Sequence, residues 1–218
     1  MILDEREPQQ ERSQARRVVI LEAAARAFDR VGYGTASLSE IAREAGVGQG
    51  LIYFYFRTKQ ALALAVIEEQ NSRTFAAMKK ESEAAASPMT ALIRASRGIA
   101  DLLLIDPIVR AGIRLSLEQG VFADPTSDFY DQWIQGVIDA FRAAGSSGEL
   151  STHLEPEQLG ASVVAYFTGV QLVSNVRFDR KDLMEVLKTM WTVLVAGIVS
   201  AERHAALQRV IEDTFTSD

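Results

Sequence analysis

The sequence contains no cysteine and only two histidines. The lack of cysteine excludes disulfides, zinc–thiolate sites and thiol catalysis. His153 and His204 lie far apart, and neither has metal-ligand spacing to another donor, so no metal site is expected. A glycine-rich phosphate loop, a nucleophile elbow and a paired-carboxylate signature are also missing. We therefore predict no catalytic residue, no cofactor, no metal and no enzymatic activity.

Long apolar runs are missing as well. No uninterrupted stretch of 18 apolar residues occurs, and the first residues lack the signal-peptide order of positive charge and then apolar core. We expect a soluble, cytoplasmic protein that does not enter a membrane. The net charge of −6 argues against a protein that coats nucleic acid through bulk charge.

The distribution of charge is more informative than its sum. Residues 1–60 hold nine Lys/Arg and eight Asp/Glu, whereas the remaining residues hold fourteen and twenty-one. A near-neutral head on an acidic body fits a site-specific nucleic-acid binder with a few placed cations, whose affinity depends strongly on salt.

Apolar residues recur at helical spacing along the chain, without strand-like alternation, which predicts an all-α protein. Residues 1–11 are polar and aperiodic and are expected to form a loose tail. Two Ser/Asp-Pro pairs, at 87–88 and 106–107, predict helix starts. The predicted helices span residues 13–31, 37–45, 48–56, 58–86, 88–105, 108–119, 128–144, 155–176 and 182–200; residues 120–127 are expected to form a loop, and a further short helix can follow residue 203.

The segment 37–59, SLSEIAREAGVGQGLIYFYFRTK, is expected to form two short helices joined by a tight turn. Ser37 and Glu40 have the spacing of a capping box, and Gly46 suits the left-handed conformation of a sharp turn. Ile52 then pins the second helix, as in a helix-turn-helix. The aromatic residues 53–56 are consecutive and therefore point all round this helix, so at least two of them must face outward.

This segment, together with the preceding AFDRVGYGTAS, resembles the DNA-binding domain of TetR-family transcriptional repressors. The resemblance implies a tail and three-helix helix-turn-helix domain over residues 1–57 and a helical ligand-binding and dimerisation bundle over residues 58–218. It places base-edge contacts at Gln49, Gly50, Leu51 and Phe54, and phosphate contacts at Tyr53, Tyr55 and Lys59.

Two features near this segment leave the DNA contacts partly open. Gly48 and Gln49 stand where many members of the family have Ser or Thr followed by Lys. A glutamine can pair with adenine, whereas a lysine favours guanine or phosphate, so the operator sequence is not predicted. Arginines near the start of the chain either lie in solvent or contact the DNA backbone or minor groove (Arg6, Arg12, Arg16 and Arg17).

Aromatic residues also gather in the second domain, where they either fill the core or line a ligand pocket. The pocket interpretation assigns Trp133 and Phe129 to its wall and a polar, orienting group to Tyr166, Thr168 or Gln171. Phe167 is assigned to the core. Gln70, in the predicted helix 58–86, has two interpretations, a solvated side chain, which is favoured, or a ligand contact.

The segments DPIVRAGIRLSLEQG, FYDQW and TGVQLVSNV resemble the regulatory domain of γ-butyrolactone autoregulator receptors, a branch of the same family, in which Trp133 matches a pocket tryptophan. This resemblance implies a small, weakly polar effector such as a γ-butyrolactone or a butenolide. The helices at about 155–176 and 182–200 are apolar over more than one face, which favours burial against a partner. In the resembling family the corresponding helices form a four-helix dimer interface.

The sequence therefore predicts a homodimeric repressor that binds double-stranded operator DNA and is released by a small molecule. Two alternatives remain. One is a drug-responsive regulator of an efflux pump with the same fold, and the other is a small-molecule sensor that acts through a protein partner.

Overall fold

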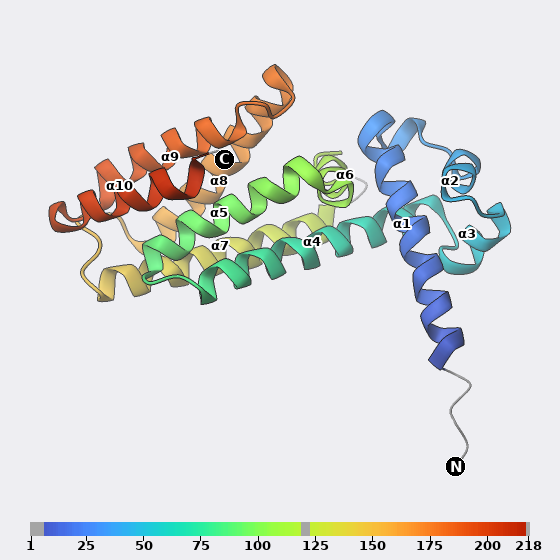
Figure 1. Cartoon of the computed structure of the whole chain (residues 1–218), viewed down its shortest axis with the longest axis horizontal. Helices are drawn as coiled ribbons and strands as arrows, with labels where there is room; N and C mark the ends of the chain where they lie inside the picture. Colours follow the sequence, from blue (N-terminus) through green and yellow to red (C-terminus); the bar gives the residue numbers. More distant parts are fainter. Residues whose placement is uncertain (1–6, 119–122, 217–218) are drawn as a thin grey trace, which may run out of the picture. The chain divides into compact units, whose positions relative to one another are not determined.

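The computed structural model describes residues 7–118 and 123–216, and for residues 7–10 and 123–126 it describes the backbone alone. In these ranges the chain forms ten α-helices and one isolated bridge between Leu150 and Val199, without a strand. The predicted all-α class is confirmed (Figure 1).

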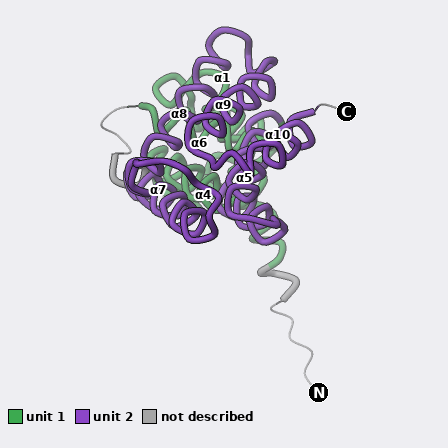
Figure 2. Tube along the Cα trace, turned by 90° about the vertical axis from the view of Figure 1, so that its left-hand side faces the viewer, with its two compact units in different colours: residues 1–73, 105–126 green, residues 74–104, 127–218 purple. Residues whose placement is uncertain are grey.

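The chain packs into two compact units, coloured separately in Figure 2. Unit 1 comprises residues 1–73 and 105–126, and unit 2 comprises residues 74–104 and 127–218. Unit 1 holds α1 (Glu7–Thr35), α2 (Leu38–Ala45), α3 (Gln49–Tyr55), the first part of α4 (Lys59–Glu83) and α6 (Pro107–Ser116). Unit 2 holds the rest of α4, α5 (Pro88–Ile105), most of α7 (Ala123–Ser146), α8 (Pro156–Phe178), α9 (Leu183–Ile198) and α10 (Ala201–Phe215). The division at residues 57 and 58 stays a prediction.

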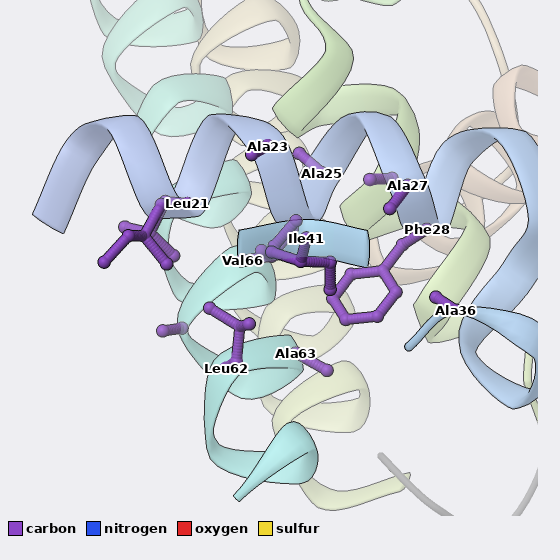
Figure 3. Packing of buried hydrophobic residues seen from close by; sticks show 14 of the residues in the cluster. Leu21, Ala23, Ala25, Ala27, Phe28, Ala36, Ile41, Leu62, Ala63 and Val66 are labelled. Carbon is purple, nitrogen blue, oxygen red and sulfur yellow. The ribbon is translucent and has the colours of Figure 1, made fainter. Parts of the chain in front are cut away.

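The core of unit 1 joins five helices, α1, α2, α3, α4 and α6, and part of it is shown in Figure 3. Phe28 of α1 and Ile41 of α2 are fully buried, and Leu62 and Val66 of α4 pack in the same cluster. Alanines at 23, 24, 25 and 27 allow α1 to lie close to its neighbours. Because α3 is only seven residues long, it depends on this packing rather than on its own hydrogen bonds.

The expected turn chemistry is present around α2. The Ser37 hydroxyl accepts a hydrogen bond from the Glu40 N–H at 3.2 Å and donates to the Glu40 carboxylate at 3.0 Å, so the predicted N-cap is confirmed. Gly46 has a φ of 67°, the left-handed conformation that the predicted turn needs. Gly32, at a φ of 79°, interrupts the helical geometry of α1 where the sequence predicts its end.

Several predicted boundaries are wrong. Residues 7–11 belong to α1 rather than to a tail, and α7 begins at Ala123, five residues before the expected start. The predicted loop at 120–127 therefore gives way to helix from residue 123, while residues 120–122 lie outside the described residues. Residues 201–215 form a full helix, α10, which packs on α9.

The helix α8 is long and apolar enough to cross a membrane by length and composition. A helix of a soluble protein passes the same test, and only 39% of its apolar window is buried. Its exposed large apolar residues are Tyr166, Leu172, Val173, Val176 and Phe178.

Candidate functional sites: the α3 face and an apolar cavity

The short helix α3 has two distinct faces. Gln49 and Gly50 are exposed at its start, and one turn later Tyr53 and Phe54 are 48% and 75% exposed. The opposite face carries Ile52, which is fully buried, and the half-buried Leu51 and Tyr55 pack on the same core. The expectation that at least two of the four consecutive aromatic residues face outward is confirmed.

Two of the predicted phosphate-contacting groups are engaged within the chain. The Tyr55 hydroxyl donates to the Ser13 backbone carbonyl at 3.1 Å and lies 2.9 Å from the Ser13 hydroxyl. The Lys59 ammonium donates to the Gly34 carbonyl at 3.2 Å and lies 4.5 Å from the centre of the Tyr33 ring. Each of these residues therefore ties α3 or the start of α4 to α1.

Several exposed arginines lie close to α3 in the sequence or on α1, to which Tyr55 of α3 is hydrogen-bonded. Arg43 and Arg57 are exposed at either side of α3 in the sequence, and Arg12 and Arg16 are exposed on α1. Arg17 lies over the Phe56 ring at 5.5 Å. Arg6 lies outside the described residues. An apolar and polar helix face flanked by arginines is the chemistry that reads base edges and holds phosphates.

The acidic side chain of Glu44, on α2, is paired with two arginines of α1. Burial alone would raise the pKa of Glu44, but hydrogen bonds from Arg26 and Arg30 outweigh it and hold the pKa below its usual value. The contacts are 2.8 Å and 3.2 Å long. Glu44 therefore stays ionised and fixes α2 against α1.

Unit 2 encloses a small apolar cavity of about 30 Å³, the space that the centre of a water-sized sphere can occupy. Trp133 of α7 lies in its wall and meets the Phe167 ring edge to face at 5.6 Å. Behind Trp133, Phe129 packs at 5.9 Å and in turn contacts Phe75 at 5.2 Å. The lining residues are Met78, Leu92, Ala95, Ser96, Ile99, Trp133, Val137, Val163, Val164, Phe167, Met190 and Trp191.

The polar groups in this wall are already satisfied. The Trp191 indole N–H donates to the Ser96 hydroxyl at 2.7 Å, and that hydroxyl donates to the Ile93 carbonyl at 2.7 Å. Sequence reasoning missed both residues. Ser96 could have been found, because it is a hydroxyl residue among the apolar residues on the buried side of α5. Trp191 was not considered as a pocket residue, because its helix was assigned to dimerisation.

The other predicted ligand-binding residues do not line this cavity. Tyr166 lies on the exposed face of α8. The Thr168 hydroxyl oxygen is buried and has no hydrogen-bond partner among the described residues, and Gln171 is 3% exposed. Gln70 is 1% exposed, so the favoured interpretation of a solvated side chain is wrong. It is buried because Gly112 of α6 lets α4 approach so closely that a Cβ there would lie 2.4 Å from the Gln70 Cβ.

Comparison with known proteins agrees with this architecture. Residues 20–66 match the family of bacterial regulatory proteins called the tetR family, and residues 86–200 match the tetracyclin repressor-like C-terminal domain. The chain is 36% identical over 179 residues to the A-factor receptor protein of Streptomyces griseus. That alignment covers 82% of this chain but 62% of the relative, so this chain spans under two thirds of that protein.

Solved structures are similar over nearly the whole chain. A γ-butyrolactone receptor described as an ArpA-like protein superposes with a TM-score of 0.81 at 28% identity, covering 94% of this chain and 98% of the receptor. CprB of Streptomyces coelicolor, solved with its biological operator sequence, superposes with a TM-score of 0.78 at 29% identity, covering 93% and 97%. Members of this family are DNA-binding regulators rather than enzymes. The chain belongs to the TetR family of bacterial transcriptional regulators, and it resembles the γ-butyrolactone receptors of that family.

Proposed function

We propose that this protein is a homodimeric, cytoplasmic repressor that binds operator DNA through α3 and is released by a small, weakly polar effector bound in unit 2. The exposed side of α3 carries the proposal, because Gln49, Gly50, Tyr53 and Phe54 face outward on a helix that follows a helix-turn-helix turn. The relative solved with its operator, CprB, supports the DNA half of the proposal.

In this proposal the second helix of the motif enters the major groove. Gln49, Gly50, Leu51 and Phe54 contact base edges, and Tyr53 and Lys59 contact phosphates. Tyr55 acts mainly on the protein side, since its hydroxyl bonds Ser13, although its position stays that of a phosphate contact in the family.

Dimerisation is proposed through α8 and α9. The open side of α8 carries five large apolar residues, and on α9 Val193 is more than half exposed beside Ala196 and Gly197. The two helices pack on each other within the subunit (Figure 1). We infer that their exposed apolar residues form one surface. Pairing this surface with a second copy removes it from water.

The effector is proposed to bind around Trp133. The cavity there is far smaller than the roughly 300–1,000 Å³ of a typical ligand site, so binding requires its wall to open. Met78 and Met190 have the flexible side chains that allow this. An apolar wall fits a weakly polar molecule, and the similarity to the A-factor receptor and to γ-butyrolactone receptors supports a γ-butyrolactone or butenolide. Phe129, Tyr166, Thr168 and Gln171 remain proposed effector contacts, whereas Gln70 belongs to unit 1 and is not proposed as a contact of this unit 2 cavity.

The experiment that tests this function is a gel shift of the purified protein on the DNA upstream of its own gene, with and without an organic extract of the producing organism. We expect a shift that the extract abolishes. A shift that no extract changes would remove the effector proposal, and no shift on neighbouring DNA would favour a sensor that acts through a protein partner.

Two variants then assign roles on α3 and α4. Gln49→Ala should relax base preference while keeping most of the affinity, because a base contact is lost. Lys59→Ala should weaken binding to all sequences alike and reduce the salt slope by about one. Affinities on the operator and on a scrambled duplex, measured at several salt concentrations, check this assignment. An equal loss of specificity in both variants would contradict it.

A further inference from the structure

The end of α1 is held by side chains from two other helices of unit 1. We call residues 33–35 the α1 end segment; it follows Gly32, whose backbone angles are φ 79° and ψ 168°. In an uninterrupted α-helix the Tyr33 N–H would donate to the Asp29 carbonyl four residues earlier. Gly32 instead turns the chain away from that geometry.

Both halves of this backbone pair are bonded by α6 or by the residues just after it. The Asp29 carbonyl accepts a hydrogen bond from the Arg114 guanidinium at 2.5 Å. The Tyr33 N–H donates to the Glu118 carboxylate at 2.9 Å. Arg110 adds an ion pair to the Asp29 carboxylate at 2.8 Å. Arg110, Arg114 and Glu118 are spaced by four residues, so one side of α6 and its extension replaces the interrupted helical bond.

The same segment is contacted by the start of α4. Lys59 donates to the Gly34 carbonyl, and its ammonium lies over the Tyr33 ring. The Tyr33 ring also packs on the buried Phe28 at 5.9 Å. Burial, and the nearby negative charge of Glu118, raise the pKa of Tyr33, so its hydroxyl stays neutral. The backbone of Tyr33 is therefore bonded to Glu118 while its ring supports Lys59.

We propose that Arg114 and Glu118 are positioning residues for DNA binding. They hold the α1 end segment in the arrangement that positions the Lys59 ammonium to contact a DNA phosphate. In the structure the Tyr33 N–H pairs with Glu118, whereas with Gly32 in helical geometry it would pair with the Asp29 carbonyl instead. A shift of α6 that breaks the first arrangement favours the second and moves the support of Lys59. This inference rests on the proposed DNA-binding function.

A double-mutant cycle between Glu118 and Lys59 tests the inference. The probe is a fluorescein-labelled duplex of the upstream region that the wild-type protein shifts. Glu118→Ala should lower the affinity by about tenfold, the scale of a hydrogen bond to a charged group. In a Lys59→Ala background the same change should lower the affinity for the duplex less than about twofold, because the ammonium that Glu118 positions is then missing. Fully additive losses would overturn the proposal, since a merely structural carboxylate gives them.

Controls separate positioning from folding. Glu118→Gln keeps an oxygen acceptor for the Tyr33 N–H and should retain affinity to within about threefold. Glu157→Ala removes the carboxylate that pairs with Arg142 in unit 2 and should leave the affinity unchanged. If Glu118→Ala unfolds in urea much more easily than wild type, Arg114→Lys takes its place in the cycle with Lys59→Ala. A less than additive loss of DNA affinity is again expected, and additive losses would overturn the proposal.

A second readout does not need DNA. The Lys59 ammonium lies over the Tyr33 ring, so the protons of the neighbouring ε-methylene should be shifted upfield in the proton NMR spectrum. Glu118→Ala should move them back toward ordinary values. An unchanged shift would overturn the proposal. If the wild-type protein bound no duplex, the proposed function would fall, and the NMR result alone would decide whether Glu118 seats Lys59.

Discussion

Tyr53 and Tyr55 are two residues apart on α3, but their hydroxyls have different surroundings. Tyr53 is exposed, whereas Tyr55 is half-buried and bonded to Ser13. Tyr55→Phe should lower the free energy of unfolding by about 1 kcal/mol, because a hydrogen bond that joins α3 to α1 is lost. Tyr53→Phe should leave stability unchanged and weaken operator binding. Urea unfolding and fluorescence anisotropy measure the two effects, and a destabilised Tyr53→Phe would contradict this division.

Phe54 has the most exposed aromatic ring on the α3 face. An exposed phenyl group on a recognition helix suits the methyl group of thymine, which is the apolar feature of the major groove. Replacing operator thymines by uracil removes only that methyl group and should weaken wild-type binding by about threefold, the value of one buried carbon. Phe54→Ala should bind both duplexes equally. A wild-type protein that is indifferent to uracil would remove Phe54 from the base-reading set.

Sequence reasoning predicted that Ile52 faces the core and that at least two of the aromatic residues 53–56 face outward. It did not predict which two they are, or how Tyr55 and Lys59 are used. The partners of Tyr55 and Lys59, Ser13 and Gly34, lie 42 and 25 residues away in the chain. Such contacts depend on how helices cross, which no local pattern specifies.

At the scale of helices, the sequence predicted the helix ends well where a proline or a glycine constrains the backbone. The helix α5 spans the predicted residues, and Asp106 caps α6 by accepting from the Ile108 N–H at 2.8 Å. The early start of α7 was missed although Asp124-Pro125 is a similar signal. The apolar spacing Leu207, Ile211 and Phe215 was present for α10, and all three are buried.

The crossing of α4 and α6 depends on one glycine. Gly112→Ala would bring a methyl group to 2.4 Å from the Gln70 Cβ, so the helices must move apart. We expect a loss of about 1–3 kcal/mol in the free energy of unfolding, despite the better helix propensity of alanine. Gly136→Ala in α7 is the matched control, because no atom lies within 4 Å of its Cβ position, and it should be neutral or stabilising. A Gly112→Ala variant with a higher free energy of unfolding than wild type would show that α4 and α6 can move apart at little cost.

At the scale of the whole molecule, the open side of α8 predicts the assembly state. Val176→Glu places a charge in the proposed dimer surface and should give monomers that bind operator at least tenfold more weakly. Ile105→Glu is a matched control, since Ile105 at the end of α5 is 76% exposed and Val176 is 77% exposed. Analytical ultracentrifugation measures the mass of each variant. Dimers that persist in Val176→Glu, or monomers in both variants, would contradict an interface on α8.

The proposed pairing of two copies through α8 also makes repression depend on the subunit concentration. Below the dissociation constant of the pair, the concentration of dimers follows the square of the subunit concentration. When the subunit concentration is halved, the concentration of the operator-binding dimer therefore falls about fourfold. Operator occupancy therefore changes more steeply than the subunit concentration. A small loss of subunits brings the target genes closer to expression before any effector binds.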